Sequence, residues 1–261
     1  MKVVILCGGQ GTRLKEETEY RPKPLVSIGG RPILWHIMKT YSYYGHKDFI
    51  LCLGYKGEMI KDYFLKFEEL TNDFTLNLRS KKERIIHHSN SNLEDWNITF
   101  VDTGLKAGTG ARLAKVKKFI GNDENFFLTY GDGIAKINID ELLAFHKRNG
   151  KTATITGVRP PSRFGEIVVR DNKIISFKEK RASADGFING GFFVFKQAIF
   201  DCLPSEEDCM LEDAPMEKLV KQDELVMFPL NDFWHCMDTY RDYLNLNERY
   251  NRADAPWKVW E

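Results

Sequence analysis

The sequence predicts an α/β protein built on a mixed, mainly parallel sheet flanked by helices. In the first half, short apolar runs alternate with stretches whose apolar residues recur at helical spacing, as in βαβ units. The first run, residues 3–7, is rich in β-branched residues and stops at glycine, which is typical of a strand buried on both faces. With 261 residues, 43% of them hydrophobic, the chain is long enough to bury a substantial core.

The first half contains four predicted parallel strands, at residues 3–7, 49–53, 97–101 and 126–129. Helical spacing appears between them, first in the segment that starts at Pro32 and ends at Gly45, residues suited to a helix start and end. Further helices are predicted over residues 60–67 and 113–120. Strands and helices in this order imply right-handed crossovers.

The pattern changes after Gly150, where strand-like runs follow one another more closely. A strand is predicted at 152–156, and residues 167–169 and 173–177 flank Asp171-Asn172 as a hairpin. The remaining elements are a strand at 187–195 interrupted by Gly190-Gly191, a helix at 211–220, a strand at 225–228 and a last helix after Asp238. Residues 71–95 read as a strand pair or as an excursion from the main body. We expect one domain over residues 1–261, with halves of about 1–150 and 151–261.

Charge and cysteine usage exclude several classes of protein. Lys and Arg number 38 against 37 Asp and Glu, for a net charge of +1, and no long basic run appears, so a nucleic-acid partner is not expected. No apolar stretch is long enough for a membrane span, and no membrane partner is expected. The five scattered cysteines contain no closely spaced pair, which favours reduced thiols in a cytoplasmic protein.

A glycine-rich loop, residues 8–14, follows the first strand directly. Ligands of open α/β sheets bind at the carboxyl ends of strands, and glycine lets the backbone approach a phosphate closely. A dinucleotide-binding fingerprint would need glycine at Leu14, and a Walker loop would need Gly-Lys-Ser/Thr at residues 12–14. The loop therefore favours phosphate binding without matching either motif, and a plain glycine turn remains the alternative.

Lys23 lies between two prolines in Arg21-Pro22-Lys23-Pro24-Leu25. Proline fixes φ on both sides and stiffens the segment that presents the ammonium. A rigidly held cation beside a phosphate loop would neutralise charge on phosphorus, and Arg13 lies close in the sequence to the same loop. An exposed lysine in a proline-rich turn is the alternative.

Asp132 and Asp238 are the candidate metal ligands. Asp132 follows an apolar strand within Tyr130-Gly131-Asp132-Gly133, and Asp238 follows the aromatic pair Phe233-Trp234. Mg²⁺ is usually held by one or two carboxylates, with water and phosphate oxygens completing its shell. Spacing does not show that the two side chains converge, and a turn at Asp132 and a helix cap at Asp238 are the alternatives.

A sugar-phosphate subsite is suggested by Glu179, Lys180 and Asn189. Glutamate and asparagine supply the hydrogen-bond acceptors and donors that a sugar ring requires, and Lys180 carries a charge suited to its phosphate. A solvated Glu-Lys pair is the alternative at 179–180.

Together these segments resemble the sugar nucleotidyltransferases over the whole chain. The resemblance rests on residues 8–14, 21–25, 28–30, 32–39, 54–57, 101–104, 129–133, 163–165, 189–193, 233–234 and 237–242. Glu16-Glu17-Thr18, the 33–38 helix and the tail Ala255-Pro256-Trp257-Lys258 are narrower signals for the cytidylyltransferase branch. Two positions depart from the family pattern: Ala111 replaces a glycine, and Arg181 replaces a proline.

The resemblance implies a Rossmann-like nucleotidyltransferase fold, with Mg²⁺ on Asp132 and Asp238 and residues 1–150 holding the nucleotide. It implies Arg13 at the leaving pyrophosphate and Lys23 at the α-phosphate. The implied nucleotide contacts are Leu6, Gly8, Gly9, Gly11, Thr12, Arg13, Lys23, Thr109, Gly110, Arg112, Gly131 and Asp132. The implied sugar-phosphate contacts, in the 151–261 half, are Gly165, Glu179, Lys180 and Asn189.

The implied reaction joins CTP and glucose 1-phosphate into CDP-glucose and pyrophosphate. A sugar-phosphate oxygen attacks the α-phosphorus in line, so positioning and charge neutralisation are the protein's main tasks and no covalent intermediate is needed. The alternatives are the same chemistry on UTP, dTTP or another sugar phosphate, a non-catalytic nucleotide-sugar sensor on this fold, and, more distantly, a nicotinamide-dependent reductase. The resemblance also implies a homo-oligomer that supplies surface-polysaccharide biosynthesis.

Overall fold

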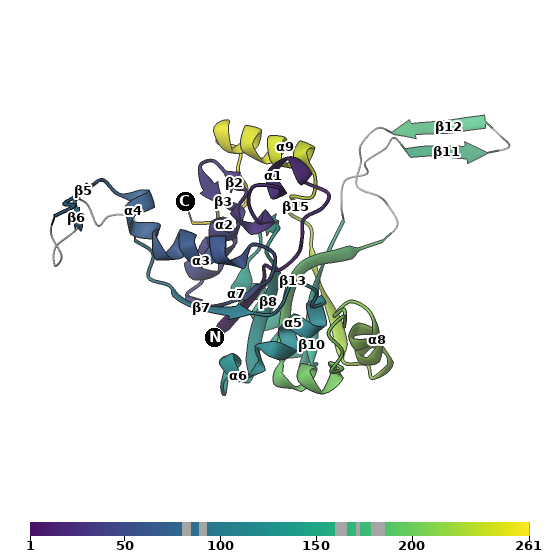
Figure 1. Ribbon diagram of the computed structural model, residues 1–261. Helices are drawn as coiled ribbons and strands as arrows, with labels where there is room; N and C mark the ends of the chain where they lie inside the picture. Colours follow the sequence, from purple (N-terminus) through teal and green to yellow (C-terminus); the bar gives the residue numbers. More distant parts are fainter. Residues whose placement is uncertain (80–84, 89–92, 160–165, 171–172, 179–185, 261) are drawn as a thin grey trace.

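A seven-stranded sheet forms the centre of the computed structural model, which describes residues 1–79, 85–88, 93–159, 166–170, 173–178 and 186–260 (Figure 1). The strand order across the sheet is β14-β10-β13-β8-β1-β4-β7. In chain order these strands are β1 (Lys2–Leu6), β4 (Asp48–Leu53), β7 (Asn97–Asp102), β8 (Asn125–Tyr130), β10 (Ala153–Val158), β13 (Ile188–Lys196) and β14 (Leu225–Leu230). The α/β class and the four predicted strands of the first half are confirmed.

One strand of this sheet runs against the other six. β1 is parallel to β4 and β8, β4 is parallel to β7, and β10 is parallel to β14. β13 is antiparallel to both of its neighbours, β8 and β10. The amino end of β13 therefore lies at the edge of the sheet where the other six strands have their carboxyl ends.

Helices cover both faces of the sheet because alternate side chains of each strand point to opposite sides. In β1, Val3 and Ile5 belong to one core cluster, and Val4 and Leu6 to the other. The first cluster also contains side chains of α2 (Ile33–Tyr43), α3 (Gly57–Leu65), α7 (Ile139–Asn149) and α9 (Tyr240–Asn251). The second contains side chains of α5 (Thr109–Lys115), α6 (Lys117–Ile120) and α8 (Ala214–Lys221). None of the described helices is both long and apolar enough to span a membrane.

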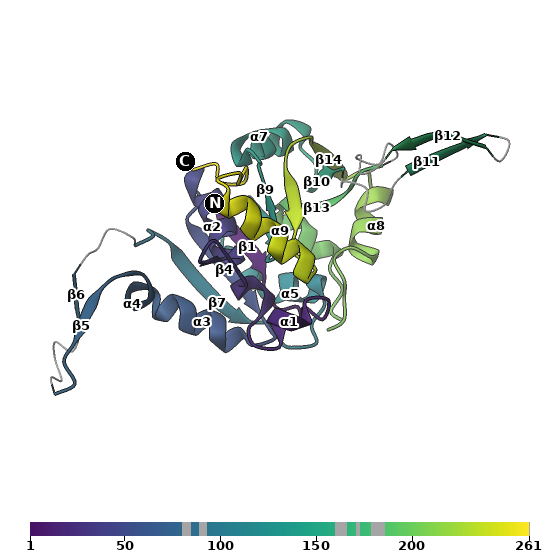
Figure 2. The same cartoon turned by 90° about the horizontal axis from the view of Figure 1, so that it is seen from above.

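Two hairpins project from the body at opposite ends, as both views show (Figures 1 and 2). The first pairs β5 (Phe74–Leu76) with β6 (Ile85–His87) and follows α4 (Phe67–Thr71), so the segment at 71–95 is both a strand pair and an excursion. The second pairs β11 (Glu166–Arg170) with β12 (Lys173–Lys178), as predicted. Its expected turn at Asp171-Asn172 lies outside the described residues.

Several elements differ from the sequence prediction, among them the helix predicted at 60–67, which is divided between α3 and α4. The helix predicted at 211–220 begins at Ala214, because residues 211–213 form a turn and the Thr109 hydroxyl accepts a hydrogen bond from the Leu211 N–H at 2.8 Å. The helix predicted at 113–120 is two helices, α5 and α6, that meet at Val116. β13 continues through its glycine pair, where Gly191 has a φ of +80°, a backbone conformation that favours glycine.

Short elements complete the chain and several of them border the site described below. They are α1 (Lys15–Thr18), a 3₁₀ turn at Lys23–Leu25, β2 (Ser27–Ile28), β3 (Arg31–Pro32), β9 (Gly133–Ala135), a 3₁₀ helix at Gln197–Cys202 and β15 (Trp234–Cys236).

Candidate active site

A cavity of about 1190 Å³ opens at the edge where β1 and β8 end and β13 begins. Most of the residues predicted from the sequence line it. They are Leu6, Gly8, Gly9, Gly11, Thr12, Arg13, Lys23, Thr109, Arg112, Gly131, Asp132, Asn189 and Asp238. The site is thus assembled at the carboxyl edge of a parallel sheet, as expected for an open α/β protein.

Lys23 lies between the two candidate metal ligands. Its Nζ donates to Asp132 Oδ2 at 2.7 Å and to Asp238 Oδ1 at 2.5 Å. The Lys23 residue is only 9% exposed, so the alternative of an exposed lysine in a proline-rich turn is wrong. Burial lowers the pKa of Lys23, but the charge of Asp132 and the hydrogen bonds to both aspartates outweigh this effect, and the net shift is upward. Lys23 is therefore a fixed cation at neutral pH.

Asp132 and Asp238 meet because two three-residue strands pair. β9, which follows Asp132, is antiparallel to β15, which precedes Asp238, and Gly133 lies opposite Cys236. The Met237 N–H also donates to the Asp132 carbonyl at 2.9 Å. Sequence spacing did not show whether Asp132 and Asp238 converge. The structure brings them together although they lie 106 positions apart in the chain.

The cap of α9 leaves the Asp238 side chain free for the cavity. Thr239 caps the helix, accepting from the Asp242 N–H at 3.3 Å, while Asp242 Oδ2 accepts from the backbone N–H groups of Thr239 and Asp238 at 2.8 and 3.2 Å. Asp238 is therefore not the N-cap that sequence analysis gave as the alternative. Its carboxylate is directed to Lys23 and to Arg13, whose Nη1 donates to Asp238 Oδ2 at 2.8 Å.

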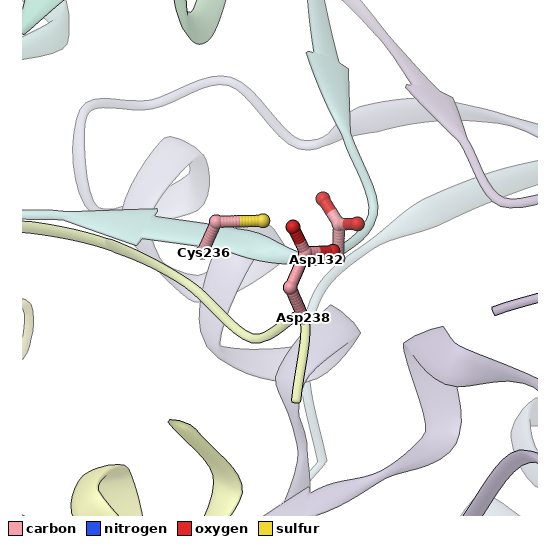
Figure 3. Close-up of side chains that lie close together, drawn as sticks. All are labelled: Asp132, Cys236 and Asp238. Atoms are coloured by element: carbon pink, nitrogen blue, oxygen red, sulfur yellow. The ribbon is translucent and has the colours of Figure 1, made fainter. Parts of the chain in front are cut away.

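The two aspartates form a compact donor set with Cys236 (Figure 3). One ligand atom from each of the three residues lies within 4.8 Å of the others. Burial, followed by the nearby Asp132 carboxylate, raises the pKa of Cys236, so the thiol remains protonated at neutral pH. Because Mg²⁺ prefers oxygen ligands, the two carboxylates and not the sulfur fit this ion.

Arg112 is buried behind the glycine loop, in a different environment from Lys23. Its Nη1 donates to the carbonyls of Leu53 and Gly104 at 3.1 and 2.8 Å and to the Thr103 hydroxyl at 2.7 Å. Its Nη2 donates to the Gly8 carbonyl at 3.1 Å. A Cβ at Gly8 would lie 2.1 Å from the guanidinium, so glycine is required for this close approach. Arg112 holds the loop by its backbone.

The segment around Thr109 contacts the cavity in part only. Thr109 and Arg112 line it, whereas Gly110 packs against Cys209: its N–H donates to the Cys209 carbonyl at 3.0 Å. Ala111, which replaces the family's glycine, is 5% exposed and clusters with Ala107 and Cys209. Ala111 is not part of the cavity lining, although its neighbour in this cluster, Ala107, is.

The sugar side of the cavity is described in part. Asn189 lies on the wall next to Tyr130, and Trp234 Nε1 donates to the Gly190 carbonyl at 2.7 Å, which ties β15 to the start of β13. Gly165, Glu179 and Lys180, the other predicted sugar-phosphate contacts, lie outside the described residues.

Sequence reasoning missed several residues that the structure brings to the site. Cys236 and Arg241 line the cavity, and Glu212 lies behind its wall. The first two flank Asp238 within four residues, so proximity to a candidate ligand was an available signal. Glu212 belongs to no recognisable motif, and only the fold places it near Thr109 and Tyr130.

Comparison with known proteins identifies the class. Residues 2–253 match the nucleotidyl transferase family, and the chain belongs to it. It is 47% identical to a probable glucose-1-phosphate cytidylyltransferase of Bacillus subtilis and 46% identical to a glucose-1-phosphate cytidylyltransferase of Salmonella typhimurium, with all of each chain covered in both comparisons. Among solved structures, HddC from Yersinia pseudotuberculosis shares the fold, with a TM-score of 0.69 and 24% identity over 95% of this chain and 99% of that chain.

These comparisons confirm the resemblance on which the sequence analysis relied. A nucleotidyltransferase family covers nearly the whole chain, and the similarity to glucose-1-phosphate cytidylyltransferases extends from end to end.

Proposed function

We propose that this protein transfers the cytidylyl group of CTP to α-D-glucose 1-phosphate, giving CDP-glucose and pyrophosphate. The observation that carries the proposal is the Lys23 ammonium held by two carboxylates on the wall of a large cavity, beside a glycine loop. The full-length similarity to glucose-1-phosphate cytidylyltransferases supports the choice of nucleotide and sugar.

The proposed reaction is a single displacement at phosphorus. A phosphate oxygen of the sugar phosphate forms a bond to the α-phosphorus, the bond from that phosphorus to the bridging oxygen breaks, and pyrophosphate leaves with the electron pair. The attacking oxygen is already anionic at neutral pH, so no general base is required. The protein is needed to align the reactants and to neutralise charge.

Within this mechanism Lys23 would stabilise charge at the α-phosphorus, and Arg13 would meet the departing pyrophosphate. The two side chains differ in a way that suits these tasks. Lys23 is buried and fixed, whereas the Arg13 side chain is 74% exposed and reaches in from the cavity mouth. Removal of one preorganised charge typically costs about 3–4 kcal/mol of transition-state stabilisation.

Asp132 and Asp238 would hold Mg²⁺, which when bound supplies positive charge to the nucleotide phosphates. The two carboxylates converge in the cavity and both accept from one cation, Lys23, which supports them as a cation-binding pair. Titration of Mn²⁺ followed by its electron paramagnetic resonance signal tests this directly. Loss of binding in Asp238→Asn is expected, and unchanged binding contradicts the assignment.

We further propose that the two halves of one domain divide the substrates. Leu6, Gly8 and Gly9 would meet the base and ribose through their backbone, with Gly11, Thr12, Gly131 and the Thr109–Arg112 segment around the nucleotide. Gly165, Glu179, Lys180 and Asn189 would meet the sugar phosphate. The inclusion of Asn189 and most of the nucleotide set in one cavity lining supports this division.

The decisive experiment measures pyrophosphate release from CTP, UTP, dTTP and GTP, each with glucose 1-phosphate and Mg²⁺. We expect turnover with CTP to exceed that with each other nucleotide. Equal rates with UTP or dTTP would remove the cytidylyl assignment but keep the chemistry. Tight CTP binding without any turnover would instead indicate a nucleotide-sugar sensor.

We also propose that the protein works as a cytoplasmic homo-oligomer that supplies an activated sugar for surface polysaccharide. The projecting hairpin supports self-association, since Phe74, Leu76, Ile85 and Ile86 are exposed apolar residues on its strands. The five cysteines are free, as expected in a reducing compartment. Light scattering of wild type and of Leu76→Asp with Ile86→Asp tests the assembly; equal masses contradict it.

A further inference from the structure

A carboxylate outside the cavity lining connects its two sides. Glu212 lies in the turn before α8, and its Oε2 accepts from the Thr109 hydroxyl at 2.5 Å while its Oε1 accepts from the Tyr130 hydroxyl. Thr109 and Tyr130 both line the cavity, but Glu212 does not. Both carboxylate oxygens of Glu212 therefore accept hydrogen bonds from residues that line the cavity.

The direction of each hydrogen bond in this chain is determined. A phenol carries one proton, and Tyr130 uses it on Glu212, so its oxygen acts as acceptor for Asn189 Nδ2 at 3.0 Å. Asn189 Oδ1 in turn accepts from the Gly191 N–H at 2.8 Å. The amide of Asn189 can have only this orientation, because its oxygen must face an N–H and its nitrogen must face the phenol oxygen.

Packing confines the Tyr130 ring as well, since a Cβ at Gly191 would lie 2.6 Å from Tyr130 Cδ2. Only glycine at 191 leaves room for the ring.

The second Nδ2 proton of Asn189 is available to a ligand. Within the part of the chain that the structure describes, Tyr130 is the one acceptor bonded to this nitrogen. Asn189 lines the cavity, so it presents a donor and not an acceptor to whatever binds there. A hydrogen-bond donor suits a hydroxyl or phosphate oxygen of the sugar phosphate.

We propose that Glu212 is a positioning residue that fixes Asn189 as a donor to the sugar phosphate through Tyr130 and holds the amino end of α5 through Thr109. The inference rests on the proposed function and adds a residue that never touches either substrate. The Thr109 hydroxyl uses its one proton on Glu212 and also accepts from the Leu211 N–H at 2.8 Å. It therefore has no proton left to donate to a substrate, and its part in the site is to hold the amino end of α5.

The test compares steady-state kinetics of Glu212→Ala, Tyr130→Phe and the double variant with wild type. Tyr130→Phe breaks the connection to Asn189 but keeps the bond from Thr109 to Glu212. We therefore expect its KM for glucose 1-phosphate to rise about tenfold while its KM for CTP stays within about twofold of wild type. Glu212→Ala removes both connections and should raise both KM values.

Coupling distinguishes a connected chain from independent contributions. If Glu212 acts on the sugar phosphate through Tyr130, the double variant should lose about tenfold in KM for glucose 1-phosphate, as each single variant does, and not about a hundredfold. Glu217 is an exposed glutamate on α8, and Glu217→Ala is the matched control, which should leave both KM values unchanged.

Additive losses overturn the positioning role. Wild-type constants in Tyr130→Phe overturn it as well, and this variant can be measured even if Glu212→Ala unfolds. Absence of CDP-glucose formation by the wild type overturns the proposed function instead, so the two failures are distinguishable. Calorimetric titration of glucose 1-phosphate alone gives a second readout, with about tenfold weaker binding expected in Tyr130→Phe.

Discussion

Lys23 and Arg112 are two cations beside the same glycine loop, and they are used in opposite ways. Lys23 faces the cavity and contacts two carboxylates. Arg112 also lines the cavity, but five hydrogen bonds connect its buried guanidinium to four backbone carbonyls and one hydroxyl. Sequence reasoning assigned both to the nucleotide.

The difference lies in what surrounds each charge. Carboxylates that hold a lysine in a cavity can also bind a metal ion, which agrees with the catalytic role proposed for this cluster. Backbone carbonyls are fixed by the fold, and the cation that binds them fixes the loop in turn. The same region therefore separates into a reactive layer and a supporting layer, and substitutions should tell them apart.

The largest expected effect is on turnover, in the reactive layer. Asp132→Ala should keep the fold and reduce kcat by a factor of about 10²–10³, because a preorganised charge is lost from the site. Pyrophosphate release and thermal unfolding are measured together. Asp62→Ala, on the exposed side of α3, is the matched control. Near-wild-type turnover in Asp132→Ala would contradict the assignment.

The supporting layer should respond in stability. Arg112→Met removes the five hydrogen bonds of the guanidinium. The Leu53 and Gly8 carbonyls keep the N–H groups of Thr103 and Tyr55 as donors, but each hydrogen bond lost from a charged group costs about 1.5–3 kcal/mol. We expect the free energy of unfolding to fall by at least about 3 kcal/mol, measured by urea denaturation. Arg148→Met on α7, an exposed arginine, should change it by less than about 0.5 kcal/mol. If Arg112→Met is as stable as wild type but no longer binds CTP, the role of Arg112 is in nucleotide binding and not in support of the loop.

A smaller, pH-dependent effect on stability is expected from His36, which contacts Trp257 of the C-terminal tail. Burial lowers the pKa of His36 from 6.5 to about 4, and its Nδ1 accepts from Trp257 Nε1 at 3.4 Å, so the neutral ring is the folded form. The unfolded chain binds a proton on this ring near pH 6.5, whereas the folded protein binds it only near pH 4. The stability that the neutral His36 ring gives the fold is therefore complete above pH 6.5 and is lost as the pH falls towards 4.

At pH 5 this linkage removes about 2 kcal/mol from the free energy of unfolding relative to pH 7.5. The comparison uses urea denaturation of wild type and of His36→Gln, whose side chain is neutral at both values. A difference between the two pH dependences of about 2 kcal/mol is expected, and parallel dependences would contradict the role of His36.

The individual buried strands and amphipathic helices could be predicted from the sequence. The run at 126–129 and the helix after Asp238 were found because burial on both faces and helical spacing leave a signature within a few residues. The direction of β13 was not predicted, since a strand of either direction buried within a sheet has the same composition.

The candidate site was predictable by residue type more than by geometry. Asp132 and Asp238 were chosen as carboxylates at strand ends, but their meeting depends on β9 and β15, which are three residues each and too short to recognise. Glu212 and the role of Arg112 depend on contacts between segments about 50–100 positions apart, which spacing does not encode.

The antiparallel strand β13 affects how well the sheet tolerates a longer connection between β10 and β13. Because β10 ends and β13 begins at the same edge, both ends of the intervening stretch, residues 159–187, are anchored beside the cavity. Lengthening a loop between fixed ends costs little, about 0.6 kcal/mol for each doubling. The stretch between these two anchors can therefore change in length and sequence while every strand of the sheet keeps its partner.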